Sequence, residues 1–383
     1  MIENTADIAE HLRFRREPEL SGTLPAHYYF DPEVFQREKE EIWFKTWQFV
    51  GYTLDLKEPG DYITTELLDQ QILIVRGKDG PLRAFYNVCM HRGHILAEGQ
   101  GNKTIFTCPF HAWSYDTTGA LKAAGNAENV NGFELKDFNL TEIRIETLLD
   151  MLVFVNLDPN AAPLASQVEG LTEQVYETVQ DFDEMVFARR DRFDIEANWK
   201  FIFDQLECYH CPVVHPEVTE TVDWDLRRHW EYGIWQRHNQ RMRPAVDNNE
   251  LARPYQIHAD DPQKGSNIWY LWPNLLLLSH WGVGNFKVLV ARPVDLDNSY
   301  EFLDCFSVND PPTAEEIAGM NRFRDTANMQ DIRCMEQQQA GIRSRGFPAG
   351  RLMVDAEHSP KSEHATHHFD RMVWEALNGA HYA

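Results

Sequence analysis

The chain has 383 residues, a formal net charge of −24 and a hydrophobic content of 43%. This length and apolar content allow two or three domains with buried cores, whereas the acidic balance argues against nucleic-acid binding, which needs a basic surface. The longest apolar runs, at 152–155 and 275–278, are far too short to span a membrane. The N-terminus lacks the basic start and apolar stretch of a signal peptide, so we expect a cytoplasmic protein.

The chain begins with a helical pattern and continues with strands. Apolar residues recur at helical spacing over residues 28–48. From a Pro-Gly turn at 59–60 onward, short apolar stretches alternate with turn residues, which indicates β-strands. We therefore predict an N-terminal helical part over 1–44, a β-rich domain over 45–158, and a region over 159–383 that forms one larger α+β domain with the N-terminal part.

Two short loops in the β-rich region each pair one cysteine with one histidine. The residues are Cys89, His91, Cys108 and His111, in the pattern C-x-H-x16-C-x-x-H. Zinc fingers usually pair cysteine with cysteine and histidine with histidine. One of each per loop instead suits a Rieske-type [2Fe–2S] cluster, in which two cysteines hold one iron and two histidines the other. A zinc ribbon, or four unrelated residues, is the alternative interpretation.

Predicted strands flank both loops. Residues 72–75 and 82–85 form a predicted hairpin across the turn at 77–80, and residues 105–107 and 113–115 enclose the second loop. Short strands of this kind hold loops rigidly. Because four of the six cysteines lie in or beside metal motifs, we expect no disulfide framework, in keeping with a reducing compartment.

A second candidate metal motif follows at residues 198–217. Glu207 and His210 are three residues apart, which predicts one shared helix face. Pro212 is expected to break or loosen that helix, so that His210 and His215 reach the same metal. Two histidines and a carboxylate form the facial triad of mononuclear Fe(II) oxygenases, which leaves positions open for O2. On these residues alone, two ordinary helix-end histidines are an equally good interpretation.

The C-terminal part is predicted to contain one long helix. Residues 313–340 have an apolar stripe, and Gly341 is a suitable end. The helix carries Asp325 and Asp331, and a lone helical aspartate is more often a surface charge than a metal ligand. A cluster of tail histidines is expected to be solvated or to lie at an interface rather than to bind metal: His358, His364, His367 and His368.

Aromatic residues and arginines downstream of the second motif are candidates for substrate contacts. The aromatics could cage a quaternary ammonium, stack on an aromatic ring or fill the core. The arginines could hold a carboxylate or face solvent. The residues concerned are Trp224, Trp230, Tyr232, Trp235, Trp269, Tyr270, Trp272, Arg237, Arg241 and Arg243.

Three segments resemble a known family over nearly the whole chain. V-C-M-H-R-G at 88–93, C-P-F-H-A-W-S-Y-D at 108–116 and E-C-Y-H-C at 207–211 are similar to the alpha (terminal oxygenase) subunits of Rieske non-heme iron oxygenases, which include aromatic-ring-hydroxylating and quaternary-ammonium-demethylating systems. The resemblance implies an α+β fold: a β-rich Rieske domain set into a larger helix-grip (START-like) catalytic domain, with an antiparallel sheet and a long C-terminal helix. Phe203-Asp204 departs from the Glu-Asn of many relatives.

The resemblance also implies roles for the motif residues. Cys89, His91, Cys108 and His111 would hold the [2Fe–2S] cluster, and His210, His215 and Asp331 would hold a mononuclear Fe(II). Asp331 is chosen because the family's carboxylate ligand precedes an E-x-x-Q-x-G pattern, which begins here at Glu336, and Asp325 is the nearest alternative. Glu207 would be a bridge rather than a ligand: in a homotrimer it would link His111 of one subunit to His210 of the next.

The implied activity is that of an O2-using terminal oxygenase. Electrons derived from NAD(P)H would arrive from a flavin/iron–sulfur reductase or a ferredoxin. Arg92 and Lys103 could form a small basic contact for an acidic donor, and two solvated surface charges are an equally good interpretation. Hydroxylation of a small aromatic or aromatic acid is the main expectation, and oxidative N-demethylation of a small quaternary ammonium compound such as a betaine is the alternative. A simple Rieske electron carrier fits less well, because a carrier needs only one domain of about a hundred residues.

Overall fold

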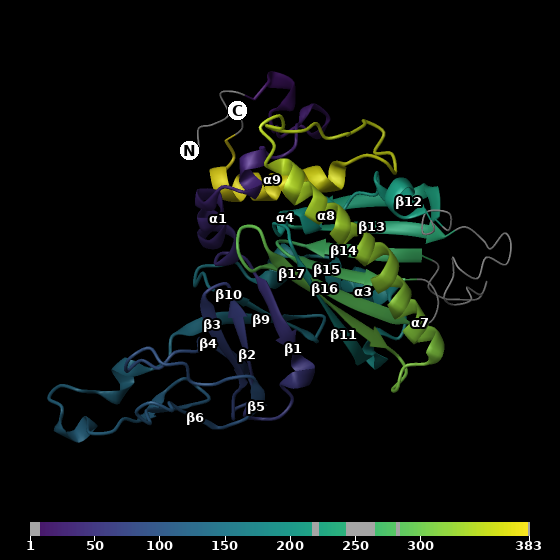
Figure 1. Ribbon diagram of the computed structural model, residues 1–383. Coiled ribbons are helices and arrows are strands. Elements are labelled where there is room, and N and C mark those ends of the chain that lie inside the picture. The colour runs from purple at the N-terminus through teal and green to yellow at the C-terminus, as the bar shows by residue number, and fades with distance from the viewer. Residues whose placement is uncertain (1–7, 217–221, 243–264, 281–283, 382–383) are drawn as a thin grey trace. The chain divides into compact units, whose positions relative to one another are not determined.

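The computed structural model describes residues 8–216, 222–242, 265–280 and 284–381 (Figure 1). The chain divides into two compact units. One unit is Trp43–Gln167, and the other combines Met1–Ile42 with Val168–Ala383. Among the described helices, none is both long and apolar enough to cross a membrane.

The unit Trp43–Gln167 is built from an antiparallel seven-stranded sheet and a smaller three-stranded sheet. The predicted hairpin is confirmed as β3–β4, in which Ile72 lies opposite Tyr86. The seven-stranded sheet has the order β1 (Gln48–Tyr52), β10 (Leu152–Asn156), β9 (Glu142–Leu148), β4 (Leu82–Tyr86), β3 (Gln70–Arg76), β2 (Asp61–Leu67) and β5 (Gln100–Asn102). The three-stranded sheet contains β6 (Ile105–Thr107), β7 (Ser114–Asp116) and β8 (Leu121–Ala123).

The larger unit is organised around a second antiparallel sheet of seven strands. The central strand β15 is almost entirely buried, which explains its near-continuous apolar sequence, and β16 is also almost entirely buried although it includes Lys287 and Arg292. The order is β11 (Val186–Ile195), β17 (Ser299–Ser307), β16 (Asn285–Pro293), β15 (Leu275–Ser279), β14 (Gly265–Leu271), β13 (Trp235–Met242) and β12 (Val222–Tyr232). The helices are α1 (Pro32–Glu38), α3 (Leu171–Thr178), α4 (Lys200–Asp204), α5 (Cys211–Val214), α7 (Ala314–Phe323), α8 (Met329–Ile342) and α9 (His364–Asn378).

The predicted long C-terminal helix is present but interrupted. It starts with a capping box between Thr313 and Glu316, and α7 and α8 are joined by a π-helical turn over Arg324–Asn328. The two helices run across one face of the seven-stranded sheet (Figure 1). Met320 of α7 packs with Leu303 and Cys305 of β17, so this face of the sheet contributes to the core.

Two local predictions are wrong. The helix predicted over 28–48 is confined to α1 and a π turn at Lys39–Trp43, because β1 already begins at Gln48. Three tail histidines are buried rather than solvated, since they lie in α9, which packs into the core. Their exposed fractions are 4% for His364, 3% for His367 and 0% for His368.

A buried ion pair joins the N-terminal segment to the rest of the larger unit. Glu38 at the end of α1 accepts hydrogen bonds from Lys200 Nζ (2.5 Å) and Trp199 Nε1 (2.8 Å). All three side chains are fully buried. A buried pair of this kind is strongly destabilised when one partner is removed, so this contact fixes the start of α4, which leads into the second metal motif.

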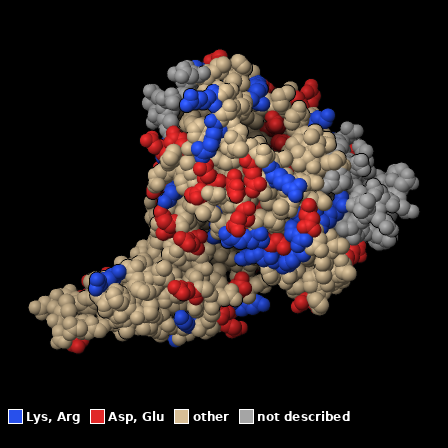
Figure 2. All heavy atoms as spheres, viewed as in Figure 1, with Lys and Arg blue, Asp and Glu red and all other residues tan. Residues whose placement is uncertain are grey.

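Charged side chains of both signs are interspersed over the visible face of the molecule, with one band of basic residues (Figure 2). The arginines of β11 are paired with aspartates. Arg189 contacts Asp191 at 2.8 Å, Arg190 contacts Asp304 at 2.6 Å, and Arg192 contacts Asp194 at 2.9 Å. The positive charges of this strand are therefore compensated locally.

Candidate functional site

The two cysteine–histidine loops share one backbone arrangement. In each, the residue four positions after the cysteine donates its N–H to the cysteine carbonyl: Gly93 to Cys89 at 2.9 Å, and Ala112 to Cys108 at 3.0 Å. Both donors have positive φ, 73° for Gly93 and 58° for Ala112. Glycine adopts this conformation freely, while alanine does so at a cost. The loops thus form a matched pair that presents equivalent side chains.

The matched loops bring the four predicted cluster ligands together. Cys89 and Cys108 are free thiols, each 2% exposed. His91 and His111 are exposed, and their ring centroids are 4.6 Å apart. A pair of buried sulfurs beside a pair of outward imidazoles is the donor set of a Rieske cluster, with one iron for each pair. The residues present therefore fit this group.

The second motif lies in an irregular turn rather than on a helix. α4 ends at Asp204 and α5 begins at Cys211, so the prediction that Glu207 and His210 share a helix face is wrong. A continuous helix would require an N–H from Pro212 to the carbonyl four residues earlier, and proline has none. Pro212 instead occupies the first turn of α5, where no donor is needed.

This turn places two imidazoles against one carboxylate of α8. Asp331 Oδ1 lies 2.8 Å from His215 Nε2 and 3.3 Å from His210 Nε2. The other ring nitrogen of each histidine also has a hydrogen-bond partner. His210 Nδ1 contacts Glu207 Oε1 at 2.7 Å, and His215 Nδ1 contacts Gln330 Oε1 at 2.6 Å. Both Nε2 atoms are therefore directed at the same carboxylate, as a facial triad requires.

The alternative carboxylate, Asp325, is not part of this group. Its side chain is 55% exposed and pairs with the neighbouring Arg324 at 2.6 Å. Asp325 lies in the π turn, whereas Asp331 lies in the first turn of α8. The geometry thus favours Asp331, which is separated from His215 by 116 residues.

The electrostatics of the three residues suit a cation. Burial alone would lower the pKa of His210, but hydrogen bonds with Asp331 and Glu207 raise it to about 10. Burial would also lower the pKa of His215, but the hydrogen bond with Asp331 raises it. Burial would raise the pKa of Asp331, but the two histidines lower it. Metal binding at such a site displaces protons from the ligands, so a bound cation would supply the positive charge that this carboxylate favours. The donor set therefore fits mononuclear iron.

A single local disulfide lies within this turn, although we expected no disulfide framework from the sequence. Cys208 and Cys211 are bonded to each other, with their Cα atoms 4.9 Å apart. The irregular turn brings these two side chains together, which the predicted helix would not do. Cys211 Sγ is 3.9 Å from His210 Nε2, but as half of a disulfide it offers no thiolate to a metal.

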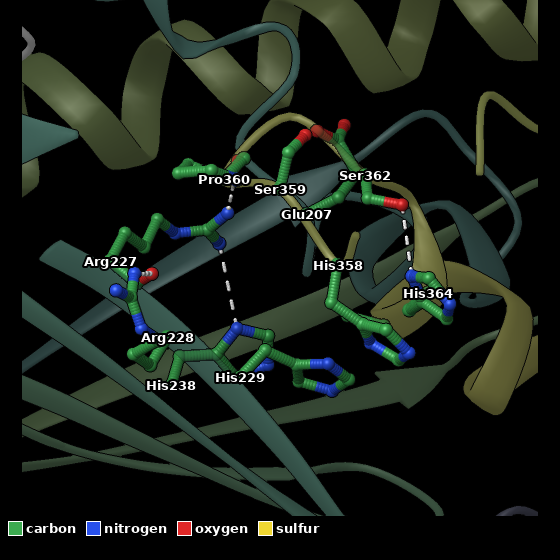
Figure 3. A pocket seen from close by; sticks show the side chains of 11 residues that line it. Glu207, Arg227, Arg228, His229, His238, His358, Ser359, Pro360, Ser362 and His364 are labelled. Atoms are coloured by element: carbon green, nitrogen blue, oxygen red, sulfur yellow. Dashed lines mark hydrogen bonds between the residues drawn. The ribbon is translucent and has the colours of Figure 1, made fainter. Parts of the chain in front are cut away.

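Glu207 lies in a buried, histidine-rich environment (Figure 3). It lines a small cavity of ≈ 20 Å³ together with Arg227, His229 and His238. Arg227 is 6% exposed and donates to the Pro360 carbonyl at 2.9 Å. Burial lowers the pKa of Arg227 to about 10, and Glu207 is the charge that opposes this shift. Arg227 was not singled out from the sequence, because nothing about one arginine in a strand indicates that it will be buried beside Glu207.

Most of the candidate aromatics belong to the core. Trp235, Trp269 and Tyr270 are at most 1% exposed. Arg237 packs over Trp269 at 5.8 Å and donates to Asn267 Oδ1 at 2.9 Å, so protein groups already hold it. The Trp224 side chain and Arg243 lie outside the described residues. Trp272 is also buried, Trp230 is 41% exposed, Tyr232 stacks on Trp235 and Arg241 is exposed.

Comparison with known proteins identifies both units. Residues 46–134 match the Rieske [2Fe-2S] domain, and residues 182–379 match the ring hydroxylating alpha subunit (catalytic domain). The chain is 35% identical to the carnitine monooxygenase oxygenase subunit of Escherichia coli K12, over 94% of this chain and 95% of that protein. The chain belongs to the Rieske non-heme iron oxygenases. The family and the two cofactors predicted from the motifs are thus confirmed.

Other relatives of this Rieske oxygenase fall into two groups. The glycine betaine monooxygenase oxygenase subunit of Pseudomonas aeruginosa UCBPP-PA14 is 32% identical over 55% of this chain and 49% of its own. A solved quaternary ammonium Rieske monooxygenase superposes with a TM-score of 0.85 at 30% identity, covering 95% of this chain and 98% of the other. Naphthalene 1,2-dioxygenase from Rhodococcus, with a TM-score of 0.77 at 18% identity, shares the fold.

Tyr115 is expected to tune the reduction potential of the Rieske cluster. Its hydroxyl is 3.5 Å from Cys89 Sγ, and burial raises its pKa, so it keeps the proton that it can donate. A hydrogen bond to a charged acceptor contributes about 1.5–3 kcal/mol. Only part of this hydrogen-bond free energy differs between the oxidised and the reduced cluster. We therefore expect Tyr115→Phe to lower the reduction potential by about 30–60 mV. Voltammetry would measure the shift.

Tyr62→Phe, which removes a hydroxyl near the Glu98 carbonyl, is the control for this prediction. Equal reduction potentials in both variants would contradict the prediction.

Proposed function

We propose that this Rieske oxygenase is a terminal oxygenase that hydroxylates a carbon bonded to the nitrogen of a small quaternary ammonium compound. The observation that carries the proposal is similarity along nearly the whole chain to a carnitine monooxygenase subunit, joined by partial similarity to a glycine betaine monooxygenase. Aromatic hydroxylation, the main expectation from sequence, is supported by a likeness in fold to naphthalene 1,2-dioxygenase and by the name of the matching family. The relatives thus favour the alternative expectation, oxidative N-demethylation of a quaternary ammonium compound.

The ligand roles follow from the two sites. We assign Cys89, His91, Cys108 and His111 to the [2Fe–2S] cluster, and His210, His215 and Asp331 to the iron. When bound, the iron would supply a site for O2 activation, and the cluster would supply single electrons. Two further side chains orient the imidazoles: Glu207 and Gln330 hold the Nδ1 atoms, so that the Nε2 atoms face the metal position.

The proposed reaction balances as a monooxygenation. One oxygen atom of O2 enters a C–H bond beside the quaternary nitrogen, and the other leaves as water with two electrons and two protons. An N-methyl group treated in this way becomes an N-hydroxymethyl group. Its C–N bond then breaks, with the electron pair going to nitrogen, and yields a tertiary amine, formaldehyde and a proton. Oxidation of a longer N-alkyl group would release a larger aldehyde instead.

Electrons need a partner protein and, in this proposal, a second subunit. A reductase or ferredoxin would dock where the cluster histidines are exposed, near the exposed side chains of Met90 and Phe110. Arg92 packs over the Phe110 ring at 5.7 Å and adds a positive charge there. In a homotrimer, His111 of one subunit would contact Glu207 of the next. A relative's structure has been interpreted in terms of inter-subunit electron transfer, which supports this arrangement.

A substrate panel tests the proposed function. The iron-loaded enzyme, a reductase and NADH would be incubated with quaternary ammonium compounds and, separately, with aromatic acids. We expect O2-dependent release of an amine and an aldehyde from at least one quaternary ammonium compound, and no oxidation of the aromatic acids. Oxidation of an aromatic acid with no product from any quaternary compound would overturn the proposal.

A further inference from the structure

Cys208 and Cys211 form a C-x-x-C pair around one of the proposed iron ligands, His210. Their sulfurs are bonded to each other, and each residue is 8% exposed. The C-x-x-C spacing is typical of thiol–disulfide exchange proteins, in which the bond opens and closes during function. Neighbouring residues are exposed, since the values are 47% for Tyr209 and 83% for Val213. The disulfide therefore lies close to the surface of the chain.

The sulfur of Cys211 lies among the metal-binding atoms. Its Sγ is 3.9 Å from His210 Nε2, the ring nitrogen that also faces Asp331. One ligand atom from each of His210, Cys211 and His215 lies within 4.8 Å of the other two. Asp331 Oδ1 is a fourth donor, 2.8 Å from His215 Nε2 and 3.3 Å from His210 Nε2. Two imidazoles, one carboxylate and one sulfur thus converge on a single position.

The separations between these atoms suit a tetrahedral ion. Zinc binds nitrogen and oxygen at about 2.0–2.2 Å and sulfur at about 2.3 Å, so neighbouring ligand atoms of a tetrahedral site lie about 3.3–3.8 Å apart. The separations of 2.8, 3.3 and 3.9 Å found here bracket that range. A facial triad leaves coordination positions open, whereas four ligands that include a thiolate form the closed arrangement of structural zinc sites. One additional sulfur ligand would therefore change the kind of metal site.

The disulfide determines whether this sulfur is available. A thiolate binds metal, and neither sulfur of a closed disulfide is a thiolate. A dithiol opens the bond by exchange: its thiolate attacks one sulfur of the Cys208–Cys211 bond, and the S–S electron pair goes to the other sulfur. The second thiol of the reductant then completes its own disulfide and releases the first cysteine. The chain gains two electrons and two protons, and Cys211 becomes a free thiol.

We propose that the Cys208–Cys211 bond selects the metal of the mononuclear site. With the bond closed, His210, His215 and Asp331 form the three-ligand site that suits Fe(II). With the bond open, Cys211 is a fourth ligand, and the site favours Zn²⁺ because thiolates are soft ligands and four ligands complete its coordination. Zinc has no redox chemistry, so the zinc-loaded enzyme is inactive. This inference concerns the metal alone and does not depend on the substrate.

Two single-cysteine variants form a matched pair for the test. Cys208→Ser removes the disulfide and leaves Cys211 as a free thiol. Cys211→Ser removes the same bond but leaves its thiol at Cys208, outside the group of metal-binding atoms described above. Each enzyme would keep its Rieske cluster and have its mononuclear iron removed by a chelator. Zinc affinity would then be measured anaerobically by competition with a coloured chelator.

We expect Cys208→Ser to bind Zn²⁺ about 100-fold more tightly than either oxidised wild type or Cys211→Ser, because only this variant has the fourth ligand. Wild type that has been reduced with dithiothreitol and freed of it by gel filtration should match Cys208→Ser. Equal zinc affinities in Cys208→Ser and Cys211→Ser would overturn the proposal.

X-ray absorption at the zinc edge identifies the ligands without any measurement of activity. Zinc in Cys208→Ser and in reduced wild type should have one sulfur at about 2.3 Å, and zinc in oxidised wild type only nitrogen and oxygen at about 2.0–2.2 Å. Absence of sulfur in Cys208→Ser would rule out Cys211 as a ligand. A sulfur in Cys211→Ser would overturn the assignment too, because it would come from another cysteine such as Cys334 of α8.

Two controls separate the switch from a loss of structure. Alkylation of the denatured protein should label Cys208 and Cys211 in reduced wild type but not in aerobically purified wild type, and equal labelling of both samples would contradict a switch. The melting temperatures and Rieske spectra of the two variants should agree, because both variants lose the same bond. A lower melting temperature in Cys208→Ser alone would assign its altered zinc binding to misfolding and overturn the proposal.

Discussion

His215→Ala should lose its mononuclear iron and all measurable substrate oxidation, yet keep a normal Rieske spectrum. His215 is 3% exposed, and its two ring nitrogens contact Asp331 and Gln330 at 2.8 and 2.6 Å. Alanine offers no donor to replace the imidazole, and a site with two remaining ligands binds iron weakly. The cluster ligands belong to a different compact unit. Iron analysis, product assays and the spectrum of the reduced cluster would be compared with wild type.

Asp331→Ala should have the same effect, and Asp325→Ala is its matched control on the same helical run. Asp325 pairs with Arg324 at the surface, so its removal should leave turnover within about twofold of wild type. If Asp325→Ala lost iron and activity while Asp331→Ala retained both, the third ligand would be misassigned. Loss of the Rieske spectrum in His215→Ala would show that the two sites do not fold independently.

Glu207→Gln should retain both metals and the oligomer, and reduce its cluster normally, but form product slowly in a single turnover. The glutamate accepts from His210 at 2.7 Å, and charge-assisted hydrogen bonds are roughly twice as strong as neutral ones. If Glu207 also links the imidazole of His111 in a neighbouring subunit, loss of its charge weakens both ends of the electron path. We expect a fall of about one to three orders of magnitude, equivalent to ~1.4–4 kcal/mol on the critical step.

Stopped-flow oxidation of the pre-reduced enzyme with substrate and O2, beside a sizing measurement, provides the test. Glu363→Gln is a suitable control, because Glu363 interacts electrostatically with Glu207 and His210 but is hydrogen-bonded to Met353 instead. It should retain a near-normal rate. A wild-type rate in Glu207→Gln, or full activity in a verified monomer, would mean that electrons take another route.

The sequence predicted features formed by residues close together in the chain better than contacts between residues far apart in the chain. The two cluster loops could be located because each holds its cysteine and histidine within four residues, between short strands with clear turn signals. Asp331 was different: nothing in a single helical aspartate marks it as a ligand, and only the family pattern beginning at Glu336 distinguished it from Asp325. The structure brings it to His215 across 116 residues.

Other features were missed because tertiary packing overrides local patterns. The helix predicted through Glu207 and His210 followed from their spacing, but Pro212 and the Cys208–Cys211 bond belong to a turn. Polar composition suggested that the tail histidines were solvated, yet α9 buries three of them. The relatives favoured the N-demethylation alternative, which the motifs could not select because no short motif marks the residues that determine substrate preference.

The π turn at Arg324–Asn328 sets the direction in which Asp331, the proposed third iron ligand, points from the helix. In an unbroken α-helix each residue advances by about 100°, so Asp331 would point roughly 80° away from Phe323, which faces the sheet. A π turn accommodates about one extra residue, and this brings the two side chains to within about 20° of the same direction. An unbroken α-helix over the same residues would swing the carboxylate away from both histidines, whereas deleting one residue would remove the π turn and leave the direction of Asp331 unchanged. The π geometry of this segment therefore directs the Asp331 carboxylate at His210 and His215.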